Sequence, residues 1–107
     1  MPSAHQLTPR ALSNLGDIWN YVAADNVKAA NRVESAILSA CTNLARHPLL
    51  GSKRTEITPL PVRFWTLSRF PNFIVLYRPE TKPLQVVAVL RGKRNIKAVQ
   101  EEPGTSS

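Results

Sequence analysis

The chain has 107 residues, 43% of them hydrophobic and 20% charged, which is the balance of a single small globular domain. Its single cysteine, Cys41, excludes an internal disulfide and a cysteine-rich zinc site. No apolar stretch is long enough to span a bilayer, and the first six residues lack the charged-then-apolar order of a secretion signal. We expect one domain over residues 1–100 and a flexible tail over residues 101–107, in a reducing, cytoplasmic setting.

The net charge of +7 is concentrated in the second half of the chain. Residues 1–52 hold four basic and three acidic side chains, whereas residues 53–97 hold ten basic and two acidic ones, a net charge of +8. This one-sided block predicts a cationic surface whose partners are polyanions or acidic protein segments. Cations scattered over a solvated surface would give the same composition.

Two amphipathic helices are predicted in the first half. Thr8 as N-cap and Pro9 at the first helical position begin the first helix. Its apolar residues at helical spacing are Leu12, Leu15, Ile18, Trp19 and Val22. The stripe of the second helix is Ala30, Val33, Ile37, Ala40, Cys41 and Leu44. This helix is expected to end at Arg46 or His47, because Pro48 disfavours helix in the residue before it.

The second half favours strands. Residues 62–67 alternate and are rich in β-favouring side chains, and residues 73–77 and 84–90 are apolar runs typical of central strands. A further short strand is expected at residues 4–7. The predicted fold class is therefore α+β, in the order β-α-α-β-β-β, with a helical hairpin packed on a small antiparallel sheet. The sheet face away from the helices is expected to be polar and to collect basic side chains.

Several of these segments carry short sequence motifs in a fixed order. The first helix carries Leu7-Thr8-Pro9-x-Ala11 and then Leu15-x-Asp17-Ile18-x-x-Tyr21. The second helix ends in Leu44-x-x-x-Pro48-x-x-Gly51. The strands carry Val62-Arg63, Ile74-Val75-Leu76-Tyr77-Arg78 and Val89-Leu90-Arg91-Gly92-Lys93-Arg94-Asn95-Ile96. In their order and spacing, these motifs resemble the RelE/ParE toxins of type II toxin–antitoxin systems. The resemblance runs from about Leu7 to Val99 and implies a toxin that a cognate antitoxin holds silent.

The resemblance implies two possible activities, because RelE-like members cut mRNA on the ribosome and ParE-like members poison DNA gyrase. Metal-independent RNA cleavage needs a base for the 2′-hydroxyl, a cation for the phosphate and an acid for the leaving oxygen. If the chain is an endonuclease, the candidates are Arg63, Tyr77, Arg91 and Arg94. A general base is hard to find, because no Tyr or His follows Arg94. The ParE-like branch is therefore favoured, with no enzymatic activity, no cofactor and no metal.

Binding residues are expected among the cations and the neighbouring aromatics. The candidates for target binding are Arg63, Arg69, Arg91, Lys93 and Arg94. Those for antitoxin binding are Phe64, Trp65 and Arg78. Phe64 and Trp65 point to opposite sheet faces, so one of them is exposed unless a partner covers it or it packs at the edge of the sheet. The expected antitoxin has an acidic, initially disordered segment that folds as it binds.

Three functions remain open at this point. The first is a toxin that binds DNA gyrase and blocks replication without breaking a bond itself. The second is a RelE-like, ribosome-dependent mRNA endonuclease, whose partners are the ribosome and mRNA. The third is a non-toxic nucleic-acid-binding module, and a toxin that has lost its activity is a further alternative. None of these readings places the protein in a membrane.

Overall fold

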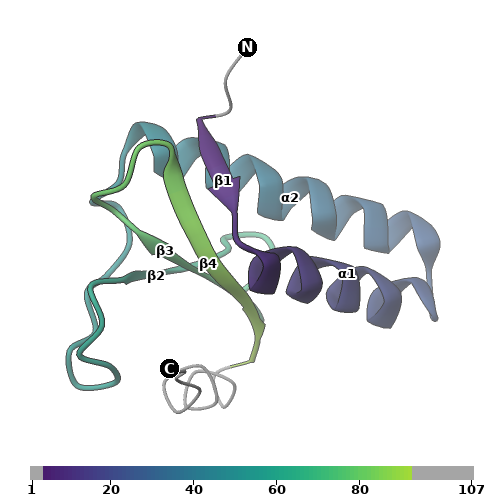
Figure 1. Cartoon of the computed structure of the whole chain (residues 1–107). Helices are drawn as coiled ribbons and strands as arrows, with labels where there is room; N and C mark the ends of the chain where they lie inside the picture. The colour runs from purple at the N-terminus through teal and green to yellow at the C-terminus, as the bar shows by residue number, and fades with distance from the viewer. Residues whose placement is uncertain (1–3, 93–107) are drawn as a thin grey trace.

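The computed structural model describes residues 4–92, which form two helices packed on one face of a four-stranded sheet (Figure 1). The elements are β1 (His5–Leu7), α1 (Pro9–Ala23), α2 (Val27–Arg46), β2 (Arg63–Thr66), β3 (Phe73–Arg78) and β4 (Leu84–Arg91). This confirms the predicted α+β class and the predicted element order. The expected flexible tail lies outside the described residues. Neither helix within residues 4–92 is long and apolar enough to cross a membrane.

The sheet has the order β1-β4-β3-β2, and it is mixed rather than purely antiparallel. The three later strands pair antiparallel through short connections, as expected. The strand β1 instead pairs parallel with β4, with His5 opposite Leu84 and Leu7 opposite Val86. The chain between β1 and β4, which holds both helices and the strands β2 and β3, provides the long connection that a parallel pairing requires.

The two helices begin where the sequence predicts. The Thr8 hydroxyl accepts the N–H of Ala11 and donates to the carbonyl of Val87, so one side chain both caps α1 and ties it to β4. The Asn26 side chain caps α2 by accepting the N–H of Ala29. A further tie comes from Val89, whose N–H donates to Asn14 Oδ1 in α1 at 3.1 Å. The helical hairpin is thus fixed to the sheet along β4.

A first core fills the space between the helices and the sheet. Its members include Leu15, Ile18, Ile37, Leu44, Val75, Tyr77 and Val86. Cys41 belongs to this core and is fully buried, and burial raises the pKa of its thiol to about 12. The thiol is therefore protonated at neutral pH and serves as a small apolar side chain. Leu12 departs from the predicted apolar stripe of α1, because its side chain is 56% exposed.

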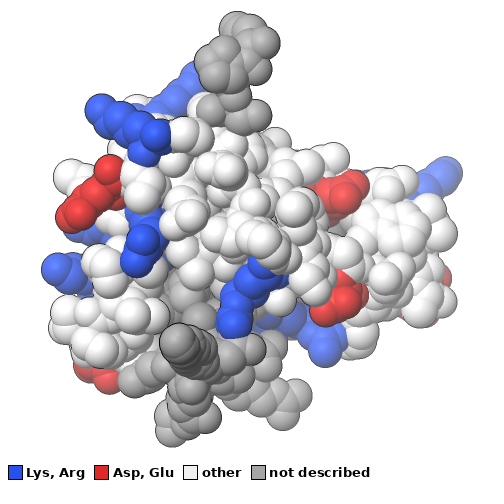
Figure 2. All heavy atoms as spheres, viewed as in Figure 1, with Lys and Arg blue, Asp and Glu red and all other residues white. Residues whose placement is uncertain are grey.

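The sheet face away from the helices is apolar, so the expectation of a polar, basic face is wrong. It carries a second cluster of buried side chains, Val62, Phe64, Ile74, Leu76, Ala88 and Leu90. Both sets of alternating positions in β3 and β4 are apolar, so these strands are buried on both faces. On the face that Figure 2 shows, the described lysine and arginine side chains lie in separate groups with mostly uncharged surface between them.

Candidate functional site

The predicted target-binding arginines lie at two opposite ends of the sheet. Arg63 opens β2 opposite Tyr77, whereas Arg91 ends β4 opposite Phe73. The partners of the two arginines, Phe73 and Tyr77, are four residue steps apart in β3, which amounts to about 13 Å along the strand. Two strand spacings of about 5 Å each separate the arginines across the sheet. Arg69 lies in the turn after β2, near the Arg91 end. Lys93 and Arg94 lie outside the described residues.

Arg63 and Tyr77 hold a turn of the backbone rather than facing an open site. The Tyr77 hydroxyl donates to the carbonyl of Pro48 at 2.5 Å and accepts the N–H of Gly51 at 2.8 Å. The Arg63 guanidinium donates to the carbonyl of Gly51 at 2.7 Å. We call Arg63, Tyr77, Pro48 and Gly51 the turn clamp, because together they fasten the chain after α2 to the start of β2.

The chemistry of Tyr77 fits this structural role. Its side chain is fully buried, and burial raises the pKa of the hydroxyl, against the smaller opposing effects of the Gly51 N–H and the Arg63 charge. The hydroxyl therefore stays protonated and able to donate to Pro48. A buried tyrosine with a raised pKa and both sides of its hydroxyl engaged is a poor general base.

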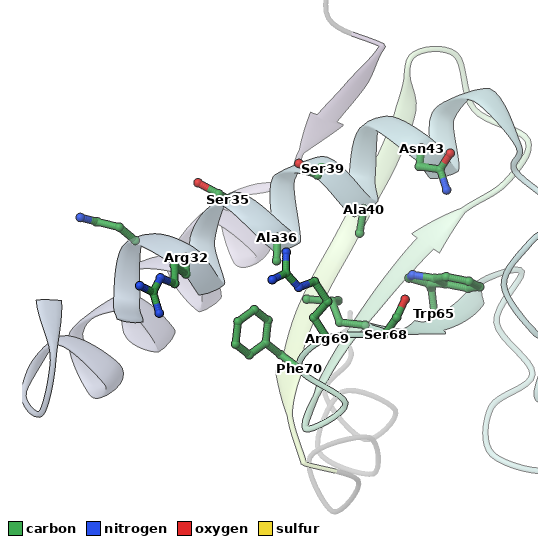
Figure 3. A pocket seen from close by; sticks show the side chains of 12 residues that line it. Arg32, Ser35, Ala36, Ser39, Ala40, Asn43, Trp65, Ser68, Arg69 and Phe70 are labelled. Atoms are coloured by element: carbon green, nitrogen blue, oxygen red, sulfur yellow. The ribbon is translucent and has the colours of Figure 1, made fainter. Parts of the chain in front are cut away.

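A groove of about 640 Å³ lies between α2 and the end of β2 (Figure 3). The helix contributes Asn31, Arg32, Ser35, Ala36, Ser39, Ala40 and Asn43, and the β2 side contributes Trp65, Leu67, Ser68, Arg69 and Phe70. The helix side runs from Asn31 to Asn43, a rise of twelve residue steps or about 18 Å of α-helix. The side chains at its centre are only serine and alanine, so the groove is kept open by small residues.

The groove brings together two residues that the sequence assigned to different roles. Trp65, a predicted antitoxin-binding residue, and Arg69, a predicted target-binding residue, both line it, and Arg69 extends toward the helix (Figure 3). Trp65 also packs its inner side against the first core. Arg32 adds a second cation from α2, and no described lining residue is acidic. The groove therefore suits an elongated occupant that carries both apolar side chains and carboxylates.

Two other predicted antitoxin-binding residues lie away from this groove. Phe64 is 6% exposed and packs in the second cluster, so its side chain does not contribute to an open surface of the free chain. Its backbone N–H and carbonyl are paired with Ser52, which further encloses it. Arg78 is exposed at the end of β3, opposite Gln85.

Sequence reasoning missed the helix side of the groove, including Arg32. The available signal was the spacing of small residues, with Ser35 and Ser39 four apart and Ala36 and Ala40 four apart, which places each pair on one helix face. It also missed Tyr21, whose ring centroid lies 3.7 Å from the guanidinium carbon of Arg91 at the end of β4.

Comparisons with known proteins agree with this architecture. The family model for the ParE toxin of the type II toxin–antitoxin system parDE matches residues 6–96. A solved structure described as the chromosomal ParDE toxin–antitoxin system from P. aeruginosa has the same fold, with a TM-score of 0.68. It is 24% identical in sequence, and the match covers 83% of this chain and 95% of that chain. No curated protein matches the sequence. Because the family model spans most of the chain, the protein belongs to the ParE toxin family of type II toxin–antitoxin systems.

Proposed function

We propose that this toxin acts by binding and inhibiting DNA gyrase in the cytoplasm, and that it breaks no bond itself. The observation that carries the proposal is the turn clamp. Arg63 and Tyr77, two of the four residues that an endonuclease would have needed, are both engaged in holding Pro48 and Gly51. Side chains fixed in this way are not available to bind a phosphate and move a proton in a transition state.

The spacing of the other candidates supports the same proposal. Arg91 lies at the opposite end of the sheet from Arg63, so these two arginines do not converge on one phosphate. A surface with separate cationic groups suits docking to a large protein, where each group meets its own acidic counterpart. Membership of the ParE family favours gyrase as that protein.

Induction of this chain alone is expected to stop DNA synthesis before protein synthesis, as measured by pulse-labelling of both in the same culture. The purified chain is expected to inhibit gyrase supercoiling and to accumulate cleaved DNA, and added antitoxin is expected to reverse both effects. Protein synthesis that stops first, with cleavage inside translated messages, would establish the endonuclease instead. Normal growth after induction would contradict both toxic activities and leave the non-toxic module and the inactive toxin as the alternatives.

The proposed antitoxin contact is the groove between α2 and β2. An acidic segment that is disordered when free would place carboxylates at Arg32 and Arg69 and apolar side chains against Trp65 and Phe70. The groove length of about 18 Å fits a helix of about twelve residues or an extended strand of about five.

Reversing the charge of Arg69 tests this contact. Arg69→Glu is expected to weaken binding of the co-purified antitoxin on the order of ten-fold or more. The reason is that the new carboxylate at position 69 would repel the carboxylates of the antitoxin segment in the groove. Titration calorimetry or competition binding measures the change. The matched control is Lys28→Glu, which makes the same charge change on α2 outside the groove. Equal effects of the two substitutions would show that net charge, not the groove, governs binding.

A further inference from the structure

A group of exposed cations lies at the end of the sheet where β2 begins and β3 ends. We call it the cationic end, and its members are Arg46, Lys53, Arg78 and Lys82. They come from four separate places in the chain: the last turn of α2, the segment after it, the last residue of β3 and the connection between β3 and β4. In Figure 2, lysine and arginine side chains gather at the left of the view, over the end of α2 and the β3–β4 connection.

The segment after α2 holds two of these cations against the sheet. Ser52 pairs with Phe64 at the outer edge of β2, so the next residue, Lys53, lies two strand spacings or about 10 Å from β3. The turn clamp fastens the end of α2 to the end of β3, which brings Arg46 to the same end of the sheet. Both side chains are exposed.

The other two cations lie on the hairpin of β3 and β4. Arg78 pairs with Gln85 across this hairpin. The Thr81 hydroxyl donates to the carbonyl of Arg78 at 3.1 Å and accepts the N–H of Gln85 at 2.7 Å. These two bonds close the connection and keep Lys82, the residue after Thr81, beside Arg78. The backbone that carries the cations is therefore fixed in the free chain.

The charges of the cationic end are not compensated within residues 4–92. None of its four side chains forms an ion pair with a carboxylate of that part of the chain. Two carboxylates lie in this region, but Glu56 is bonded to its neighbour Arg54, and Glu80 faces the four cations alone. The other described carboxylates lie on the helical hairpin: Asp17, Asp25 and Glu34. Four exposed cations repel one another in the free chain, and a polyanion relieves that repulsion.

We propose that the cationic end binds the phosphate backbone of duplex DNA, and that it contacts the DNA on which gyrase acts while the toxin is bound to that enzyme. The inference rests on the proposed function and names a contact within it. Duplex DNA carries one negative charge per roughly 1.7 Å of its axis, so cations mounted on four separate segments meet several phosphates at once. Phosphate contacts fix position and carry no sequence information, so binding is expected to be independent of the DNA sequence.

The surroundings of these cations favour a nucleic acid over an acidic protein segment. The connection between β3 and β4 exposes proline, glutamate and lysine side chains and no aromatic ring. Protein interfaces are instead dominated by aromatic and arginine side chains that fill pockets. None of the four cations lines the groove proposed for the antitoxin. Two exposed leucines, Leu49 and Leu50, lie in the chain between Arg46 and Lys53, and their removal tests for a protein partner.

The test measures binding of the purified toxin to a fluorescent DNA duplex, without gyrase, over a range of salt concentrations. Four phosphate contacts predict a slope of about −3 to −4 in the logarithm of the binding constant against the logarithm of the salt concentration. The double variant Lys53→Gln/Lys82→Gln is expected to make this slope shallower by about two and to weaken binding at low salt on the order of ten-fold or more.

Two controls separate the site from the net charge. Lys53→Arg/Lys82→Arg substitutes the same two positions and keeps both charges, so it is expected to retain the slope. Lys28→Gln removes a charge from the start of α2 and is expected to change the slope by much less than one. Leu49→Ala/Leu50→Ala is expected to leave the affinity for DNA unchanged.

Gyrase assays with the same variants connect this surface to the proposed function. Lys53→Gln/Lys82→Gln is expected to raise the concentration that inhibits supercoiling on the order of ten-fold, and the arginine double variant is expected to inhibit like the wild type. If the wild type binds the duplex through these cations but leaves supercoiling untouched, the DNA surface stands and the gyrase proposal fails. If a variant that has lost its affinity for DNA still inhibits fully, the gyrase proposal stands and the DNA contact is overturned.

Three further results would also overturn the inference. The first is a wild-type chain that does not bind the duplex at low salt. The second is an equal loss of slope in Lys28→Gln and in single Lys53→Gln, which would leave only net charge as the cause. The third is a loss of antitoxin or gyrase affinity in both the lysine and the leucine double variants with DNA affinity intact, which would assign the surface to a protein.

Discussion

Gly51→Ala is expected to lower the free energy of unfolding by about 2–4 kcal/mol, because it combines overpacking with the loss of buried hydrogen bonds. A Cβ at position 51 would lie 2.6 Å from the Tyr77 hydroxyl, 2.8 Å from Tyr77 Cε1 and 2.9 Å from the carbonyl oxygen of Phe64. None of these atoms belongs to a flexible surface side chain: Tyr77 is fully buried, and the Phe64 carbonyl accepts the N–H of Ser52. The turn must therefore move away and release the clamp.

Chemical denaturation measures this loss, and Gly16→Ala is its matched control. Gly16 lies in the exposed middle of α1, where an added Cβ meets nothing within 4 Å. That substitution is expected to stabilise the protein by about 0.5–1 kcal/mol, because alanine loses less backbone entropy than glycine in a helix. A Gly51→Ala variant as stable as the wild type would mean that the turn adapts freely, and the turn clamp would not then be a fixed part of the fold.

The helices and most of the strands could be predicted because their signals are local. Thr8 and Pro9 mark one helix start and Pro48 one helix end, and each acts within a turn of its own position. The parallel pairing of β1 with β4 could not be predicted from such local signals. Only three residues make the strand, and its partner β4 lies almost eighty residues away, so no nearby pattern specifies its direction.

The apolar character of the second sheet face could have been predicted and was not. Residues 73–77 form a continuous apolar run, which is typical of a strand buried on both sides, and so do most residues of β4. The expectation of a basic face followed the count of cations in this half of the chain. That count is correct, but the cations among residues 53–92 lie in turns and at strand ends, where side chains reach solvent without displacing the core.

The candidate site was only partly predictable for a similar reason. Trp65 and Arg69 stand in one segment of the sequence and were both singled out, although for different partners. Arg32 was not, because its place opposite Arg69 depends on how α2 lies across the sheet, which no local pattern fixes. The Tyr21 contact with Arg91 joins positions seventy residues apart and depends on the same packing.

Tyr77→Phe separates the structural role of the turn clamp from a catalytic one. Without the hydroxyl, the Gly51 N–H and the Pro48 carbonyl lose their partner, and Gly51 is itself buried. The expected loss in the free energy of unfolding is about 1–3 kcal/mol. The burial that raises the Tyr77 pKa keeps the hydroxyl protonated, so the wild-type advantage is present at neutral pH and declines only as the pH rises past the ordinary tyrosine range.

The toxic activity of folded Tyr77→Phe decides between the structural and the catalytic role of Tyr77. If the clamp is structural, Tyr77→Phe arrests growth as strongly as the wild type per folded molecule, at a temperature well below its unfolding midpoint. If Tyr77 were the acid or base of an endonuclease, cleavage would fall on the order of 10²- to 10⁴-fold with the fold intact. Arg63→Ala provides the parallel case, because it removes the bond to the Gly51 carbonyl but leaves the tyrosine in place. Variants that lose stability together and keep their toxicity when folded would place Arg63 and Tyr77 in the scaffold, and the toxic contact elsewhere on the surface.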